Sequence, residues 1–155
     1  MKILLAVDGS GHSTAAVGEV AHRRLPAGSE VRIISVVDTS YYAPAFPGGG
    51  VGNVALLVEI EAAAQIRARA AVDAAAASIR AVAENPTCSV TADVLSGSAK
   101  LEILQDTEAF GADLIVVGSH GHGHFERFRL GSVSHAVALH ANCSVEIVRT
   151  PRDGT

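Results

Sequence analysis

Residues 2–10, KILLAVDGS, place an apolar run directly before an aspartate, a glycine and a serine. Residues 114–118, LIVVG, form a second apolar run that stops at a glycine. Short apolar runs bounded by turn residues are typical of strands that are buried on both faces of a sheet. We therefore expect both runs in the centre of a parallel sheet.

Outward from these two runs, the chain alternates between strand and helix patterns. The expected strands cover residues 2–7, 30–37, 88–96, 114–117 and 145–148. The expected helices run from Ser10 or Ser13 to about 24, from 55 to about 84, from 99 to 110 and from 131 to about 140. This alternation predicts an α/β fold, an open parallel five-stranded sheet with helices on both faces. In the strands at 89–95 and 145–148, polar residues interrupt the apolar ones, so both strands are expected at the sheet edges.

One domain is expected over residues 1–155, with residues 39–54 as a flexible loop insertion because that segment is rich in glycine, proline and aromatic residues. The Ala-rich segment 55–84 lacks glycine and proline, which predicts one long amphipathic helix covering the sheet. The residues expected to share the apolar side of helix 99–110 are Leu101, Ile103, Leu104 and Phe110.

The composition excludes several classes of protein. Hydrophobic residues make up 48% and charged residues 18%, which excludes a disordered chain. The net charge is −4 and no block of Lys or Arg occurs, which argues against nucleic-acid binding and against a polybasic membrane patch. The first apolar run is too short for a signal peptide, so a cytoplasmic location is expected. Cys88 and Cys143 are expected to be two separate reduced thiols.

A candidate phosphate cradle follows the second central run. Residues 118–132 read GSHGHGHFERFRLGS, and glycines let backbone N–H groups approach an anion closely. Gly131 and Ser132 are expected to open a helix, whose N-terminus adds further N–H donors and a favourable dipole. The chain contains only Lys2 and Lys100, so the cradle has no Walker-type lysine.

The spacing Gly118-x2-Gly121-x9-Gly131-Ser132 after an apolar strand resembles the ATP-binding signature of the universal stress protein family. ILLAVDGS at 3–10 and IISVVD at 33–38 resemble the first two strands of that family. The resemblance covers nearly the whole chain, with 39–54 matched least. It implies the strand order 3-2-1-4-5 and ATP, with or without Mg²⁺, in the crevice between the first and fourth strands.

The resemblance also implies a role for nine residues. Asp8 would hold the ribose, while Ala6 and Val36 would lie beside the adenine. The residues implied on the ribose and α-phosphate side are Val117, Gly118 and Gly121. Those implied at the phosphates are Gly131, Ser132 and Val133. Each role has a plainer alternative: Asp8 could only stabilise a turn, and each glycine could only end a strand or start a helix.

Other polar and aromatic residues leave alternatives open. His120, His122 and His124 could bind a metal ion, although a solvated loop is favoured and no metal site is expected. Arg127 and Arg129 could neutralise phosphates or be solvated. Tyr41, Tyr42 and Phe46 could cover the adenine or pack the loop.

The family resemblance implies an ATP-binding, nucleotide-responsive regulator or stress-tolerance factor. We hypothesise that ATP orders loops 39–54 and 119–130 and so changes a partner surface, because a loop expected to be mobile lies next to the expected ligand site. Two alternatives remain, a slow ATPase or phosphotransfer enzyme using the same pocket, and a dimeric interaction module without a nucleotide role. No Gly-x-Ser-x-Gly motif follows a strand, so no catalytic residue is assigned and at most a weak ATPase is expected.

The last strand, 145–148, is expected to pair with a second copy, because an edge strand leaves backbone groups unpaired and the resemblance implies a homodimer there. Val145, Ile147 and Val148 would supply apolar surface. Ser144 and Glu146 depart from the expected pattern; Glu146 could guard the edge or pair with Arg149 of the other copy.

Overall fold

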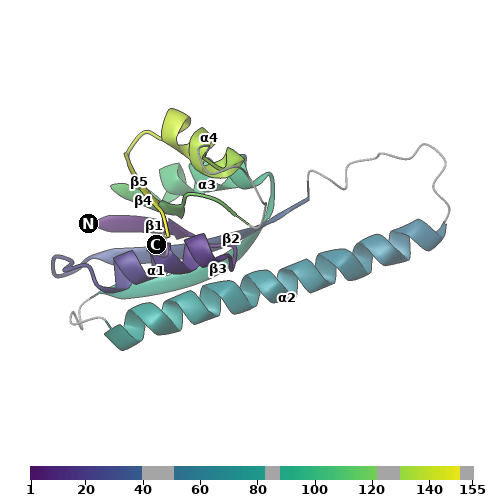
Figure 1. Ribbon diagram of the computed structural model, residues 1–155, viewed down its shortest axis with the longest axis horizontal. Coiled ribbons are helices and arrows are strands. Elements are labelled where there is room, and N and C mark those ends of the chain that lie inside the picture. The colour runs from purple at the N-terminus through teal and green to yellow at the C-terminus, as the bar shows by residue number, and fades with distance from the viewer. Residues whose placement is uncertain (40–50, 83–87, 122–129, 151–155) are drawn as a thin grey trace, which may run out of the picture.

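The computed structural model describes residues 1–39, 51–82, 88–121 and 130–150, and the side chains of the helix beginning at Val51 from residue 55 onward. It contains a five-stranded parallel sheet with the order β3-β2-β1-β4-β5, as expected (Figure 1). The strands are β1 (Lys2–Ala6), β2 (Glu30–Asp38), β3 (Ser89–Gly97), β4 (Leu114–Gly118) and β5 (Ser144–Val148). The helices are α1 (Gly11–Ala21), α2 (Val51–Val82), α3 (Ala99–Phe110) and α4 (Ser132–His140).

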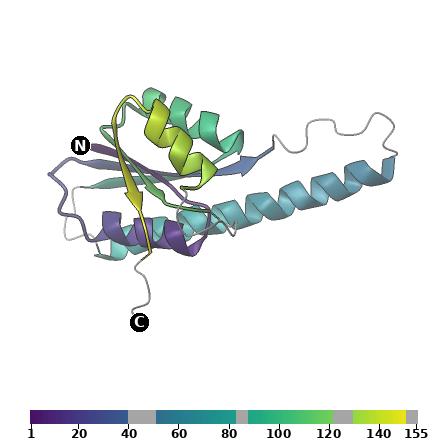
Figure 2. The ribbon, with the colours of Figure 1, turned by 45° about the horizontal axis from the view of Figure 1, so that its top comes forward.

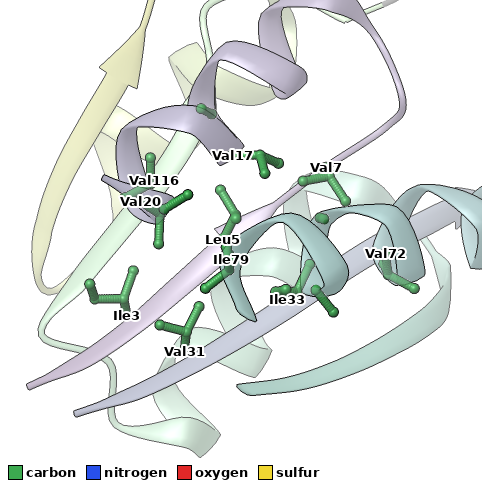
Figure 3. Close-up of a cluster of buried hydrophobic side chains, with 14 of the residues drawn as sticks. Ile3, Leu5, Val7, Val17, Val20, Val31, Ile33, Val72, Ile79 and Val116 are labelled. Carbon is green, nitrogen blue, oxygen red and sulfur yellow. The ribbon is translucent and has the colours of Figure 1, made fainter. Parts of the chain in front are cut away.

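The central strands are apolar without interruption because helices cover both faces of the sheet. Figures 1 and 2 show α1 and α2 on one face and α3 and α4 on the other. Along β1, Ile3 and Leu5 lie in the cluster under α1 and α2 (Figure 3). Leu4 lies in the cluster under α3 and α4. The alternation of a strand thus sends neighbouring side chains into two separate cores.

The sequence-based boundaries agree with the structure to within one residue except at α1, which ends at Ala21 and not near residue 24, and at α2. Helix α2 begins at Val51, so residues 51–54 are helical and the predicted loop 39–54 is too long at its end. Once an Ala-rich helix exists, each added turn costs little, which explains the extension through Gly52. The predicted end near Asn85 and residues 40–50 lie outside the described residues.

The prediction that α2 covers the sheet is correct only for its second half. Its buried residues are Ala68, Val72, Ala75, Ala76 and Ile79. Residues 55–62 are all exposed, and Figure 2 shows this half extending beyond the sheet. The lengths explain why, since 32 helical residues span about 48 Å and the nine of β2 span about 30 Å. No helix in the described part of the chain is long and apolar enough to cross a membrane.

The apolar side predicted for α3 is wrong at one position. Ile103 is 3% exposed, but Leu101 is 57% exposed. The two residues are two apart, which places them about 200° apart around a helix, so they cannot share one face. Leu104 and Phe110 are half-buried.

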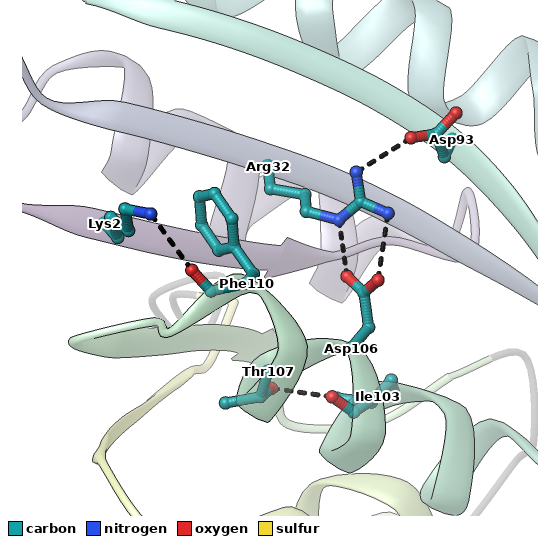
Figure 4. Close-up of polar contacts among 7 residues, drawn as sticks. All are labelled: Lys2, Arg32, Asp93, Ile103, Asp106, Thr107 and Phe110. Atoms are coloured by element: carbon teal, nitrogen blue, oxygen red, sulfur yellow. Dashed lines mark hydrogen bonds and ion pairs between the residues drawn. The ribbon is translucent and has the colours of Figure 1, made fainter.

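An ion-pair network fastens α3 to the sheet (Figure 4). The Arg32 guanidinium on β2 donates from Nε and Nη2 to the Asp106 carboxylate at 2.6 and 2.9 Å, and from Nη1 to Asp93 Oδ2 at 2.9 Å. The hydrogen bonds to Asp106 raise the pKa of Arg32. This network therefore links β2, β3 and α3 with one cation.

Glu146 on the edge strand β5 has a partner within its own chain. Arg23 Nη2 donates to both carboxylate oxygens of Glu146, at 2.7 and 2.6 Å. Arg23 follows α1, so this pair ties the end of α1 to β5. The sequence analysis missed it because 123 residues separate the two groups.

The two cysteines are free thiols, as expected. Both Cys88 and Cys143 are half-buried, and burial raises the pKa of each thiol. Two of the three histidines considered as metal ligands, His122 and His124, lie outside the described residues. Within the described ranges, no group of three or more His, Cys, Asp or Glu residues could hold a metal ion.

Candidate functional site

The carboxyl ends of β1 and β4 meet at the same edge of the sheet. The two strands pair in parallel with Ala6 opposite Val117, so the turn after β1 and the loop after β4 leave the sheet side by side. Ligands of open parallel sheets bind at this edge, where the strand order reverses. Here the strand order reverses at β1, which has β2 as its neighbour on one side and β4 on the other.

A cavity of about 220 Å³ opens at this edge. All nine residues implicated by the sequence line it: Ala6, Asp8, Val36, Val117, Gly118, Gly121, Gly131, Ser132 and Val133. The sequence analysis did not assign the other lining residues to the site: Val7, Ser13, Ile34, Ala99, Ile103, His120 and Ser134. Ala99 and Ile103 were detectable in principle, because they begin the helix that follows another strand at the same edge.

Asp8 has a structural contact in the turn and also lines the cavity. Its Oδ1 accepts a hydrogen bond from Ser10 N at 2.9 Å, which is the turn-stabilising role considered above. A carbon atom added as Cβ to Gly121 would lie 2.6 Å from Asp8 Oδ2. The second carboxylate oxygen therefore lies directly beside Gly121, the residue implicated at the α-phosphate. Gly9 between Asp8 and Ser10 has φ 81°, a conformation that favours glycine.

Gly118 is required for packing. A Cβ there would lie 2.7 Å from the backbone carbon of His12 and 2.9 Å from Ser13 N, so the start of α1 could not rest on the end of β4. Gly131 is less restricted, with a Cβ 3.2 Å from the Cα of His120. Gly118, Gly121 and Gly131 are all absent from the positive-φ residues of the described chain, so the space around them, and not their backbone conformation, favours glycine at these positions.

The start of α4 faces the cavity without a side-chain cap. Gly131 is the N-cap residue and has no side chain, so no side-chain oxygen accepts from the N–H groups of the first turn. The segment is nevertheless held in place, because Ser119 O accepts hydrogen bonds from Gly131 N at 2.8 Å and from Ser134 Oγ at 3.0 Å. By contrast, Ser10 caps α1 by accepting from Ser13 N. An uncapped helix start offers N–H donors and the positive end of the helix dipole to an anion.

A cluster of His12, Ser119 and His120 lies against the same wall. Ser119 is 1% exposed, and its Oγ lies 3.3 Å from His12 Nδ1 and 3.2 Å from His120 Nδ1. A hydroxyl has one hydrogen, so it can donate to only one of the two imidazoles, and at least one ring donates its Nδ1–H to Ser119 Oγ. The sequence showed His120 only as a loop residue or metal ligand, because His12 is distant in the chain.

Several residues weighed in the sequence analysis lie outside the described residues. They are Tyr41, Tyr42 and Phe46 in the loop after β2, and Arg127 and Arg129 in the loop before α4. Their suggested contacts with a nucleotide stay predictions.

Comparison with known proteins identifies the family. The model of the universal stress protein family matches residues 1–149. This chain belongs to the universal stress protein family. Universal stress protein MJ0531 of Methanocaldococcus jannaschii is 28% identical over 151 residues, which cover 97% of this chain and 83% of that protein.

Solved structures share the fold. Universal stress protein UspA from Lactobacillus plantarum superposes with a TM-score of 0.79 at 26% identity, covering 96% of this chain and 97% of that one. The hypothetical protein MJ0577 superposes with a TM-score of 0.81 at 24% identity, covering 98% and 97%. The sequence-based fold class, including the strand order, is therefore confirmed for this family member.

Some structures with this fold contain adenine nucleotides. An Arabidopsis thaliana family protein has AMP bound, at 16% identity, TM-score 0.63 and coverage of 99% and 94%. The universal stress protein from Archaeoglobus fulgidus is in complex with dAMP, at 21% identity, TM-score 0.59 and coverage of 96% and 97%. A further universal stress protein is in complex with cAMP, at 19% identity, TM-score 0.61 and coverage of 97% and 98%. At these identities the likeness shows the fold alone.

Proposed function

We propose that this protein binds ATP in the cavity at the carboxyl ends of β1 and β4 and acts as a nucleotide-responsive regulator. The observation that carries the proposal is the convergence of all nine implicated residues on one cavity. The AMP, cAMP and dAMP held by proteins of the same fold support an adenine nucleotide as the ligand class.

The chemistry of the wall suits the parts of a nucleotide. Val36, Ile34 and Ile103 supply an apolar surface for a flat base, which gains from burial. Asp8 supplies an acceptor for ribose hydroxyls, and charged hydrogen bonds of this kind are stronger than neutral ones. The uncapped start of α4 at Gly131 and Ser132 supplies donors for phosphate oxygens.

A magnesium ion would arrive with the phosphates. Asp8 is the one carboxylate among the described residues that line the cavity, and it is assigned to the ribose, so phosphate oxygens and water would hold the ion. In this proposal Mg²⁺ neutralises phosphate charge, and the residues of the chain bind and orient the nucleotide.

Calorimetric titration of the purified protein, first stripped of nucleotide, tests the proposal. ATP is expected to bind at one molecule per chain, and GTP more weakly, because the implied backbone contacts read the adenine edge. Extracting the freshly purified protein and identifying the released ligand by mass is the complementary measurement. Absence of heat with every adenine nucleotide at millimolar concentration, together with a ligand-free extract, would contradict the proposal and favour the interaction module.

Phosphate release separates a binding protein from a slow ATPase. We expect ATP to be recovered intact after prolonged incubation with Mg²⁺, since no catalytic residue is assigned. Release of inorganic phosphate that disappears in Asp8→Ala would assign hydrolysis to this pocket and replace the regulator by the enzyme.

A further inference from the structure

The exposed apolar side chains of this protein are concentrated on one segment. Nine large apolar residues in the described chain are exposed, and five of them lie within eleven residues of α2. These five are Leu56 (55% exposed), Leu57 (39%), Val58 (61%), Ile60 (40%) and Ile66 (71%). We call residues 55–70 of α2 the arm. Clustered apolar exposure of this kind marks an interaction site more often than isolated residues do.

The first half of the arm gains little support from its own chain. Residues 55–62 are all exposed, and Figure 1 shows this half of α2 extending away from the sheet. In the second half of the arm, Gln65 and Arg69 donate to Ser96 Oγ and Ala92 O of β3 at 2.8 and 3.3 Å, and Ala68 is buried. Helical stability in proteins comes mainly from packing of an apolar face, and a helix segment in water is marginal. A partner that covers the arm would therefore supply the packing that the sheet gives to Val72 and Ile79.

One face of the arm points away from the sheet. Successive helical residues are about 100° apart, so Ala63 lies opposite the buried side marked by Val72. The residues grouped around Ala63 at three- and four-residue spacing are Leu56, Glu59, Ile60, Ile66, Arg67 and Ala70. Three of the five exposed apolar residues thus lie on this face, whereas Leu57 and Val58 lie about 120° and 140° from Ala63. Another helix can approach this face without meeting the sheet, and Ala63 at its centre permits a short distance between helix axes.

The charges on this face indicate which partner binds it. Glu59 precedes Ala63 by one turn, and Arg67 follows it by one turn. An antiparallel copy centred on Ala63 brings each Glu59 level with Arg67 of the other copy, whereas a parallel copy places like charges level. The same symmetry brings Ile60 level with Ile66. The arm contains two glutamates, Glu59 and Glu61, and two arginines, Arg67 and Arg69, so its charges balance and do not favour an anionic membrane surface.

We propose that the arm binds the arm of a second copy of this chain, as an antiparallel helix pair centred on Ala63. This contact is separate from the expected pairing of β5, because α2 packs on β2 and β3 and β5 forms the opposite edge of the sheet. It does not depend on the nucleotide.

Cysteine cross-linking tests the geometry directly. Ala63→Cys is expected to give a disulfide-linked dimer under mild copper-phenanthroline oxidation, because the two-fold axis places residue 63 opposite itself. Ala77→Cys is the matched control, an exposed alanine of the same helix whose two copies would lie about 42 Å apart in this pairing. The unaltered chain controls for Cys88 and Cys143. Equal cross-linking at 63 and 77, or none at 63, overturns the proposal.

Exchanging the charges of Glu59 and Arg67 tests whether the partner is a second arm. Glu59→Arg and Arg67→Glu alone are each expected to weaken self-association by about tenfold, because each replaces two attractions with two repulsions in the symmetric pair. Mixing the two variants, or combining both changes in one chain, is expected to restore association in sedimentation velocity. Circular dichroism confirms that every variant keeps its helices. If mixing and recombination restore nothing, the arm contacts something other than a second arm, and the proposal is wrong.

Discussion

At the scale of single residues, Asp8 combines a structural and a proposed ligand role. One carboxylate oxygen accepts from Ser10 N at 2.9 Å, and the residue lines the cavity. Asp8→Ala is expected to lower ATP affinity by about 1.5–3 kcal/mol, the range for a hydrogen bond to a charged group. It should also reduce the preference for ATP over 2′-deoxy-ATP. Calorimetry with both nucleotides measures this.

Asp8→Asn is the matched variant, because its amide oxygen can keep the bond to Ser10 N while the charge is lost. If the unaltered protein binds ATP and its 2′-deoxy analogue equally, Asp8 does not read that hydroxyl. If Asp8→Ala lowers the urea midpoint while affinity per folded chain is unchanged, its role is confined to the turn.

Gly121 is predicted to keep the phosphate side of the cavity open. Gly121→Val would place its Cβ 2.6 Å from Asp8 Oδ2, the end of a side chain that can move. The fold should survive, while ATP affinity falls by more than about tenfold because the side chain occupies ligand space. Gly131→Val, with a Cβ 3.2 Å from the Cα of His120, is expected to act in the same direction. Unchanged affinity in both folded variants would exclude the proposed cradle.

At the scale of elements, the contact of α1 with β4 depends on Gly118. Gly118→Ala sets a Cβ 2.7 Å from the backbone of His12, and backbone cannot move aside as a side chain can. We expect a loss of about 1–3 kcal/mol in the free energy of unfolding. Urea denaturation measures it, and this effect differs from that of Gly121→Val, which concerns binding.

Gly18→Ala in α1 is the control, a glycine substitution for which the free energy of unfolding is expected to rise and not fall. A Cβ at Gly18 meets nothing within 4 Å, and alanine favours helix over glycine by about 1 kcal/mol. Stability is therefore expected to rise. Equal effects of the two substitutions would show that helix propensity, and not the close approach to β4, controls this part of the fold.

At the scale of the whole molecule, β5 offers an edge for pairing with a second copy. Val145 and Ile147 are half-buried, but Val148 is 8% exposed and packs in the core, so it cannot contribute to an interface as expected. Glu146 is engaged by Arg23, which weakens the suggested pairing with Arg149 of the other copy. The apolar contribution of this edge is thus smaller than the sequence indicated.

We still expect β5 to mediate a homodimer, through its backbone groups and Ile147. Light scattering at micromolar concentration should give at least twice the chain mass of 15.9 kDa. Ile147→Lys should lower the mass, because pairing would bury an unpartnered charge. A mass of one chain in the unaltered protein excludes this contact and the arm contact together at that concentration.

The two expected contacts use different elements, β5 at one edge of the sheet and the half of α2 that extends beyond the sheet, so they would be independent. A copy that uses both can join two different neighbours, and the assembly is then larger than a dimer. Ala63→Cys cross-linking in the Ile147→Lys background distinguishes them, because it reports the arm alone.

The sequence by itself determined the order of strands and helices, the buried centre of the sheet and the nine residues that meet at the cavity. The order and the buried centre follow from local periodicity, which acts within a few residues. The nine residues follow from the family resemblance, which the glycine spacing and the first two strands carry. The tertiary structure alone decided the exposure of Leu101, the pairing of Glu146 with Arg23, the packing role of Gly118 and the projection of α2. Each depends on how elements distant in the chain are rotated and how their lengths compare, and a local pattern carries neither quantity.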